Sequence, residues 1–310
     1  MHTILGAAQY PRYRWNQRFE TWACPLSDSE DQRCQNAENV IRAALDVDPT
    51  LSRANLLVFA QGSYRANTNI RADSDIDICV CHQDVFFAQY PAGTDMNTFG
   101  NSGAGLKFSD FKNQVGYALQ RRFGITGVTR GAKSFKVHAN TYRIDADVVP
   151  VFEYRWYYLN NGIQDHLSGI KFISDAGASV INWPEQTYQN GVDKNRATGW
   201  KYKQVVRILK NLRGEMQAAN IQAAKDFPSF LIESLVWNVA DNFFDGDDLY
   251  DIVNKVVLDA WYNTYDEGRC KKWTEVNGIK YLFSTSQPWT RIQANNFLWA
   301  VREFVGFSNS

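Results

Sequence analysis

Residues 61–81 read Gln-Gly-Ser-Tyr-Arg-Ala-Asn-Thr-Asn-Ile-Arg-Ala-Asp-Ser-Asp-Ile-Asp-Ile-Cys-Val-Cys, and this stretch decides the expected fold. It places a glycine turn, Gly62-Ser63, eleven residues before an alternating run that starts at Asp75. The apolar residues 55–60 just before the turn have the composition of a buried strand, and the alternation over residues 75–81 is that of a second strand. We therefore predict a strand, a tight turn, and a strand that begins with acidic residues.

Two pairs of carboxylates are predicted to meet at one edge of a sheet. Residues i and i+2 of a strand share a face, so Asp75 and Asp77 aim at one point. Asp145 and Asp147 repeat this spacing in a later strand candidate, residues 142–152. Carboxylates that lie so close repel one another, and divalent cations relieve the repulsion. Oxygen ligands suit Mg²⁺ or Mn²⁺ rather than zinc.

The glycine turn is predicted to bind phosphate. Gly62 permits close backbone approach, and backbone N–H groups with the Ser63 hydroxyl can hold phosphate oxygens. An isolated Asp-x-Asp or Gly-Ser is usually a solvated turn, but the ordered combination of both with a later Asp-x-Asp strand is far more specific. Phosphate beside a two-metal carboxylate site suits an in-line attack on a nucleotide α-phosphorus.

Composition excludes several classes of protein. The chain has 310 residues, 33 Lys plus Arg against 33 Asp plus Glu, and 45% hydrophobic residues. The zero net charge argues against a protein that coats duplex nucleic acid, and the apolar content argues against disorder. No apolar run has the length of a membrane span or a secretory signal, and the five cysteines include no Cys-x-x-Cys pair. We expect a cytoplasmic protein without a membrane partner.

The first half of the chain is predicted to be mixed α/β and the second half nearly all α. After an irregular opening, the capping-box spacing of Ser27 and Glu30 predicts a helix that runs to Leu45. Residues 160–195 are predicted to be a loop region, and Pro150 to break the strand candidate around it. Further helices are predicted at residues 110–123, 199–224, 230–244, 249–265 and 290–304, and a further strand at residues 134–139.

Together these motifs resemble the nucleotidyltransferase superfamily that includes DNA polymerase β, and within it the group of cyclic GMP-AMP synthase and the oligoadenylate synthases. The chain is most similar to the bacterial members of that group, the CD-NTases of CBASS antiphage defence. The resemblance covers most of the chain and rests on residues 26–30, 62–77, 147–152 and 227–239.

The resemblance implies a fold and a domain organisation. The implied fold class is α/β (α+β): a polymerase β-like mixed sheet, over residues 1–190, and a C-terminal helical lobe, over residues 191–310. The helix around residues 36–45 would brace both lobes, as the long spine helix does in the family. Nucleotide would bind between the two parts.

It also implies roles for individual residues. Asp75, Asp77 and Asp147 would be the catalytic metal ligands, with Asp145 a neighbour of uncertain role. Gln61, Gly62 and Ser63 would contact the nucleotide phosphates.

A helix rich in Lys and Arg is the second implied nucleotide contact. Lys203, Arg207 and Lys210 share one helical face, and in the family such lysines bind the triphosphate. We assign that role to Lys210 first and Lys203 second. A solvated amphipathic face is the alternative interpretation, and Lys133 and Lys136 have the same ambiguity. Candidates for base recognition are Asn182, Tyr64, Tyr202 and Thr198.

The implied activity is the joining of nucleoside triphosphates (ATP, GTP, UTP or CTP) into a cyclic di- or trinucleotide, with release of pyrophosphate and two Mg²⁺ or Mn²⁺ ions as cofactors. The alternatives are a linear oligonucleotide synthase, nucleotidyl transfer to a tRNA, an antibiotic or a protein, and an inactive nucleotide-binding scaffold. Three intact carboxylates argue against the scaffold, because an inactive protein has no need of their repulsion. No Cys/His cluster resembles the zinc insertion of the animal relative, so activation by duplex DNA is not expected. A regulatory protein partner stays open.

Overall fold

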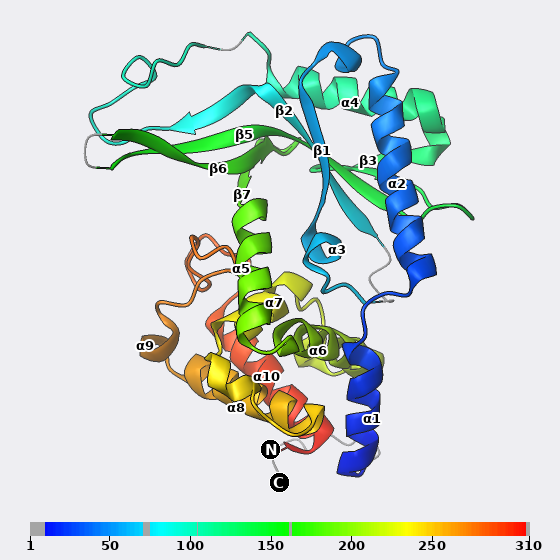
Figure 1. The fold of residues 1–310 in the computed structure, drawn as a ribbon, viewed down its shortest axis with the longest axis vertical. Coiled ribbons are helices and arrows are strands. Elements are labelled where there is room, and N and C mark those ends of the chain that lie inside the picture. Colours follow the sequence, from blue (N-terminus) through cyan, green and yellow to red (C-terminus); the bar gives the residue numbers. More distant parts are fainter. Residues whose placement is uncertain (1–9, 71–74, 104, 161–162, 308–310) are drawn as a thin grey trace. The chain divides into compact units, whose positions relative to one another are not determined.

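The computed structural model describes residues 10–70, 75–103, 105–160 and 163–307 (Figure 1). The chain divides into two compact units, each with its own core. The first, here called the sheet unit, comprises residues 27–65 and 74–185, and the second, the helical unit, comprises residues 1–26, 66–73 and 186–310. The predicted division at residue 190 therefore differs from the structure in three places: residues 1–26, 66–73 and 186–190 belong to the helical unit.

The sheet unit is built on one mixed sheet, which confirms the predicted architecture (Figure 1). Its strands are β1 (Leu56–Gln61), β2 (Ile76–Gln89), β3 (Val128–Arg130), β4 (Phe135–Val137), β5 (Ala146–Asn160), β6 (Ile163–Ile173) and β7 (Ser179–Asn182). The order is β1-β2-β5-β4-β3, and farther along β5 the strand β6 pairs with it and with β7. β2 and β5 are parallel, and the other pairs are antiparallel.

The prediction that Pro150 breaks its strand is wrong. Pro150 lies inside β5, where it is the register partner of Val80 in β2. On the other side of β5, the pairing with β4 ends at Val148 and the pairing with β6 begins at Phe152. Proline is tolerated here because its missing N–H falls in the gap between these two ladders.

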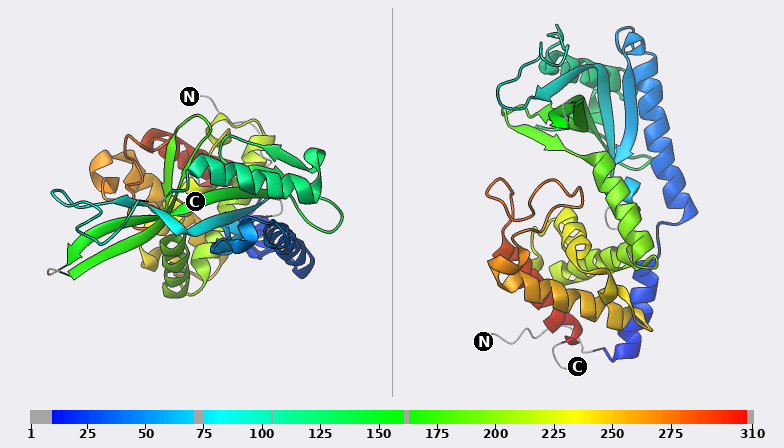
Figure 2. Two further views of the ribbon diagram at one scale, coloured as in Figure 1. Left: turned by 90° about the horizontal axis from the view of Figure 1, so that it is seen from above. Right: turned by 60° about the vertical axis from the view of Figure 1, so that its left-hand side comes forward.

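Two helices pack against each other and against this sheet (Figures 1 and 2). They are α2 (Asp28–Asp46) and α4 (Phe108–Phe123). The capping box of Ser27 and Glu30 is present at the start of α2, as predicted, and Gly124 ends α4 at a φ of 79°. His82 on β2 is buried against Phe111 of α4 and has a structural role.

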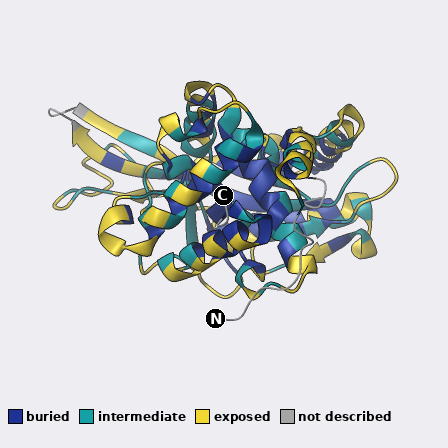
Figure 3. Ribbon diagram, turned by 90° about the horizontal axis from the view of Figure 1, so that it is seen from below, coloured by how far each residue is buried: buried dark blue, intermediate teal, exposed yellow. Residues whose placement is uncertain are grey.

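The buried apolar residues of the helical unit form one core. Figure 3 shows in dark blue the buried positions along the ribbon. Its helices are α1 (Arg12–Ala23), α5 (Pro184–Ala197, which starts in the sheet unit), α6 (Lys201–Ala218), α7 (Ser229–Asn238), α8 (Leu249–Tyr265), α9 (Glu267–Cys270) and α10 (Arg291–Val305). α1 was predicted to be irregular. Its stripe of Trp15, Phe19 and Ala23, four residues apart, packs into this core, and the polar residues between them obscure the periodicity.

The loop predicted for residues 160–195 is also wrong. This stretch contains β6, β7 and most of α5. Trp183-Pro184, a turn signal in the sequence, starts α5, because proline suits the first position of a helix, where its missing N–H costs nothing. None of the helices in the described ranges combines the length and the apolar content of a membrane span.

Candidate active site

The strand register brings the predicted carboxylates together. In the antiparallel pair β1–β2, Gln61 is the partner of Asp77, and in the parallel pair β2–β5, Asp77 is the partner of Asp147. Asp75 and Asp145 directly precede the two parallel strands, and the Ile76 N–H donates to the Asp145 carbonyl at 3.0 Å. The sequence-based expectation that the two Asp-x-Asp strands are neighbours is confirmed.

The glycine turn lies directly against this cluster. Gly62 follows β1, begins the short helix α3 (Gly62–Ala66), and has a left-handed φ of 65°. A Cβ added to Gly62 would overlap the Asp77 carboxylate. Only glycine combines this φ with this approach, so the turn and the carboxylate form one site.

Burial and mutual repulsion disfavour the ionised forms of Asp77 and Asp147. Desolvation, followed by the charges of Asp147 and Asp75, raises the pKa of Asp77 to about 6. Desolvation likewise raises the pKa of Asp147, although the charge of Lys136 opposes it. Such raised values in a cluster of acids are typical of functional sites.

A cation from the chain already lies against the cluster. The Lys136 ammonium is 2.7 Å from the Asp75 carboxylate and 3.7 Å from that of Asp145. Lys136 lies on β4 as the register partner of Asp147, so side chains from β4 and β5 meet here. The hydrogen bond to Asp75 is the main reason that the pKa of Lys136 is raised.

The chemistry of this donor set fits a divalent cation. The oxygens are carboxylates that repel one another and attract a positive charge, which are the properties of a Mg²⁺ or Mn²⁺ site. Within the described ranges, no three His, Cys, Asp or Glu side chains are already grouped as metal ligands, and Asp75 is turned to Lys136 instead. The ligand set Asp75, Asp77 and Asp147 therefore stays a prediction.

Replacing Asp77 by Asn is expected to stabilise the metal-free protein, and more so at high pH. The folded-state pKa of about 6 exceeds the ordinary value of 3.8, so the protein loses stability as the pH rises from about 3.8, where Asp77 ionises in the unfolded chain, to about 6, where it ionises in the folded one. In EDTA, urea unfolding should give Asp77→Asn an advantage of about 3 kcal/mol at pH 8 and little or none at about pH 3.

The exposed Asp165 provides the control, because the His166 N–H and the Tyr158 hydroxyl lower its pKa. Asp165→Asn should gain no stability at either pH. An Asp77→Asn advantage that is equal at pH 3 and pH 8 would contradict the role of ionisation.

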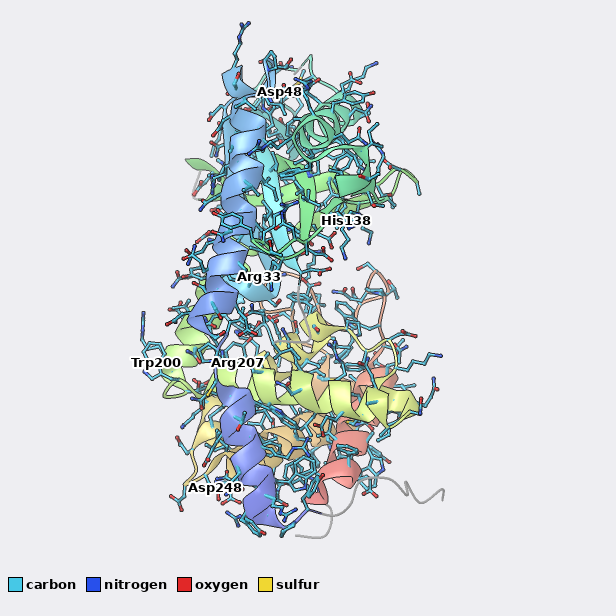
Figure 4. The ribbon with its side chains drawn as sticks, turned by 90° about the vertical axis from the view of Figure 1, so that its right-hand side faces the viewer. Arg33, Asp48, His138, Trp200, Arg207 and Asp248 are labelled. Carbon is cyan, nitrogen blue, oxygen red and sulfur yellow. The ribbon has the colours of Figure 1, made fainter. Side chains whose placement is uncertain are left out.

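Helix α2 contacts both the turn before β5 and the residue after the glycine turn, all within the sheet unit. Arg33, labelled on α2 in Figure 4, donates to the carbonyls of Asn140 and Arg143, at 3.2 Å each, in the turn that precedes β5. Asp31 accepts a hydrogen bond of 2.8 Å from the hydroxyl of Tyr64, directly after the glycine turn. Tyr64, a candidate for base stacking in the sequence, is therefore bound to α2.

The lysine candidates in the helical unit differ from one another. Lys210 is completely buried on α6, and its ammonium is 2.6 Å from the Glu233 carboxylate. Lys203 is partly exposed, and among the described residues its ammonium has no hydrogen bond or ion pair. Desolvation, with the charge of Arg207, lowers its pKa. The predicted order of preference is therefore reversed: Lys203 is the better candidate for binding phosphate.

Of the base-recognition candidates, only Asn182 keeps its side chain available. It is the last residue of β7, partly exposed, and its amide has no hydrogen bond within the described ranges. Tyr202 is buried in the helical core, and the Thr198 hydroxyl accepts from the Tyr202 N–H at the start of α6. Both are structural residues.

Sequence reasoning underrated Lys136 and left the role of Asp145 open. Lys136 alternates with the buried Phe135 and Val137, a pattern that places its side chain on the opposite face of the strand. That alternation could have identified it as a neighbour of the carboxylates. Asp145 accepts from the Ala139 N–H, and so closes the turn before β5.

Comparisons with known proteins show which family the chain belongs to. The family model described as the cGAS/DncV-like nucleotidyltransferase C-terminal helical domain matches residues 189–306. A cyclic dipyrimidine nucleotide synthase, CdnE, of Legionella pneumophila is 41% identical over 293 residues, which are 94% of this chain and 98% of the relative.

Two solved structures have the same fold. One is the CdnE c-UMP-AMP synthase of Rhodothermus marinus with Apcpp and Upnpp, with a TM-score of 0.80 and 31% identity over 93% of this chain and 95% of that one. The other is the CdnE cyclic dinucleotide synthase of Elizabethkingia meningoseptica with GTP and Apcpp, with a TM-score of 0.78 and 32% identity over 94% and 98% of the two chains.

Proposed function

This chain belongs to the bacterial CD-NTases, the cGAS/DncV-like nucleotidyltransferases, and from that membership we propose that it joins nucleoside triphosphates into a cyclic oligonucleotide for antiphage signalling. The observation that carries the proposal is the strand register, in which Asp77 lies between Gln61 and Asp147. The glycine turn and the carboxylates thereby lie at one edge of the sheet, which supports a shared role in the reaction.

Each residue of this edge has a task in the proposed reaction. Asp75, Asp77 and Asp147 would hold two Mg²⁺ or Mn²⁺ ions, which when bound would activate the attacking hydroxyl and neutralise the leaving pyrophosphate. The Asp147 carboxylate, whose pKa is raised by burial, accepts the proton of the attacking hydroxyl. Gly62 and Ser63 bind the β- and γ-phosphates through backbone N–H groups and the Ser63 hydroxyl.

Two further residues would contact the nucleotide. Lys203 binds the triphosphate, since its ammonium is without a partner among the described residues. Asn182 reads a base edge, because a carboxamide both donates and accepts hydrogen bonds.

The bases that the relatives join differ. The Legionella relative at 41% identity is described as a dipyrimidine synthase, so we expect UTP or CTP among the substrates.

The test is product formation from the protein and nucleotides alone. We expect the purified chain, with all four nucleoside triphosphates and Mg²⁺ or Mn²⁺, to form a phosphatase-resistant product. Mass spectrometry should give the mass of a cyclic di- or trinucleotide, and pyrophosphate should appear at one equivalent for each linkage. Linear, phosphatase-sensitive products would instead favour an oligonucleotide synthase, and no product under any mixture would refute the proposal.

A further inference from the structure

The carboxylate cluster of the sheet unit has a cation from the same unit beside it, the ammonium of Lys136. This ammonium donates a hydrogen bond of 2.7 Å to Oδ2 of Asp75, and it lies 3.7 Å from Oδ2 of Asp145. The first distance is that of a strong charge-assisted hydrogen bond, whereas the second is that of a looser ion pair. Lys136 is therefore bound to one predicted metal ligand, and a second carboxylate, without a predicted role, lies next to it.

The backbone that carries Lys136 is held in place. Lys136 is the middle residue of β4, which ends just before His138, labelled in Figure 4. β4 pairs with β3 on one side and with β5 on the other, and both of its other residues are buried. In the turn before β4, the Ala132 carbonyl accepts hydrogen bonds from the Lys112 ammonium at 2.8 Å and from the Asp175 N–H at 2.9 Å. A change of partner by Lys136 must therefore come from rotation of its own, partly exposed side chain.

Asp145 is fixed as a second partner for this ammonium. Its Oδ1 atom accepts the N–H of Ala139, and its backbone carbonyl accepts the N–H of Ile76 at 3.0 Å. The other carboxylate oxygen, Oδ2, is the one that lies 3.7 Å from Lys136. A movement of the ammonium by about 1 Å would turn this separation into an ordinary charge-assisted hydrogen bond.

The charges of the site favour an exchange of cations. The starts of two neighbouring strands gather up to four negative charges, from Asp75, Asp77, Asp145 and Asp147. Lys136 supplies a counter-charge against them. A divalent cation held by Asp75 would compete with the ammonium for this carboxylate, because two cations at such short range repel each other. Metal binding at Asp75 would therefore weaken the pair between Asp75 and Lys136.

We propose that Lys136 is the resting counter-cation of the carboxylate cluster, and that Asp145 takes it over when metal binds at Asp75. In the metal-free protein, the ammonium neutralises Asp75. Asp145 acts on metal binding through Lys136 and is not itself a ligand, so both are positioning residues. This exchange of partners rests on the proposed function, because it concerns the metal ligands assigned there.

Lys136→Met tests the resting contact in the absence of nucleotide. Methionine keeps most of the length of the side chain and removes its charge. Because the competing cation is gone, calorimetric titration with Mn²⁺ should give a Kd at least about fivefold lower than in the original chain. In EDTA, the thermal midpoint should fall by at least about 2 °C, because the carboxylates lose their counter-charge. An Mn²⁺ Kd that stays the same, or an unchanged midpoint, would overturn the resting contact.

Asp145→Asn tests the takeover, and a cycle of single and double variants shows whether Asp145 acts through Lys136. Asparagine can still accept the Ala139 N–H but cannot form an ion pair, so the Mn²⁺ Kd should rise at least about fivefold. In the Lys136→Met background, the same substitution should change the Kd by less than about twofold, because no ammonium has to be taken over. An equal loss of affinity in both backgrounds would show that Asp145 acts on the metal directly, and would overturn the takeover.

Lys107→Met is the matched control for the loss of one lysine charge. Lys107 is exposed at the start of α4, where Phe108 packs on Phe152 of β5. Phe152 lies about 16 Å along the strand from Asp147, at about 3.3 Å for each residue. Salt at about 0.15 M screens charges over such a distance, so the Mn²⁺ Kd and the midpoint should stay the same. Shifts equal to those of Lys136→Met would mean that net charge alone explains them, and would overturn the resting contact.

Metal binding and product formation separate the exchange of partners from the proposed function. A chain that bound Mn²⁺ as expected but made no product would refute the proposed function and leave the exchange standing. A chain that made product, with an Mn²⁺ affinity insensitive to Lys136→Met, would refute the exchange alone. A chain that bound no Mn²⁺ would refute the exchange together with the metal site.

Discussion

The double substitution Asp75→Asn with Asp77→Asn is expected to abolish product formation, with a loss of at least about 1,000-fold, or about 4 kcal/mol of transition-state stabilisation. Both residues lie where β2 begins, and Asp77 is the register partner of Asp147. Asparagine keeps the size of the side chain but removes the charge that would bind a cation. Initial rates of pyrophosphate release at saturating nucleotide would measure the loss.

The double variant should remain folded, which separates loss of chemistry from loss of structure. Removing two carboxylates from a cluster that raises the pKa of Asp77 to about 6 relieves repulsion. The Lys136 ammonium loses its ion pair with Asp75 in this variant, but the Asp145 carboxylate, 3.7 Å away, still pairs with it. We therefore expect a thermal midpoint in EDTA equal to or above that of the original chain.

Asp84→Asn is the control for this experiment. Asp84 lies on the same strand but is exposed, and it accepts a hydrogen bond of 3.2 Å from the Asn55 N–H, outside the cluster. Its substitution should leave the rate within about twofold. Product at a tenth of the original rate from the double variant would contradict the assignment of the carboxylates.

The motifs predicted the neighbouring carboxylate strands and the glycine turn because the causes of this arrangement are local. Alternation along a strand fixes which side chains share a face. A turn that needs a left-handed φ favours glycine, and that residue is visible in the sequence. The neighbouring strands, the turn at Gly62 and the capped helix from Ser27 were all predictable in this way. Their physical causes act within a few residues or between two strands.

The sequence did not predict what depends on burial. Lys210 and Arg207 appear as exposed cations on a helical face, and only the packed core shows that each has its charge satisfied inside the helical unit. α1 was missed because an apolar stripe between arginines has a weak periodicity. Pro150 was misjudged because its tolerance depends on where two other strands end.

The structure also shows that the spacer between the glycine turn and Asp75, residues 64–74, is not a free linker where it is described. Thr68 is buried, and its hydroxyl donates to Glu233, a residue distant in sequence, so this contact has no pattern along the chain. The sequence shows eleven mostly polar or small residues between two motifs. In the structure, Thr68, Asn69 and Ile70 of that stretch are buried, so a substitution there acts on packing.

Gly62→Ala is expected to reduce the rate by about 100-fold or more, although it adds a single methyl group. The new Cβ would overlap the Asp77 carboxylate, and the φ of 65° is unfavourable for alanine by about 1 kcal/mol.

Gly100→Ala separates these two effects, because Gly100 has the same φ of 65° but no atom of the described residues within 4 Å of its added Cβ. Gly100→Ala should carry the backbone cost with an unchanged rate. Suppose that Gly62→Ala and Gly100→Ala lose stability alike and both keep full activity. The close approach of the glycine turn to Asp77 would then not be required, and the turn would have no role in the mechanism.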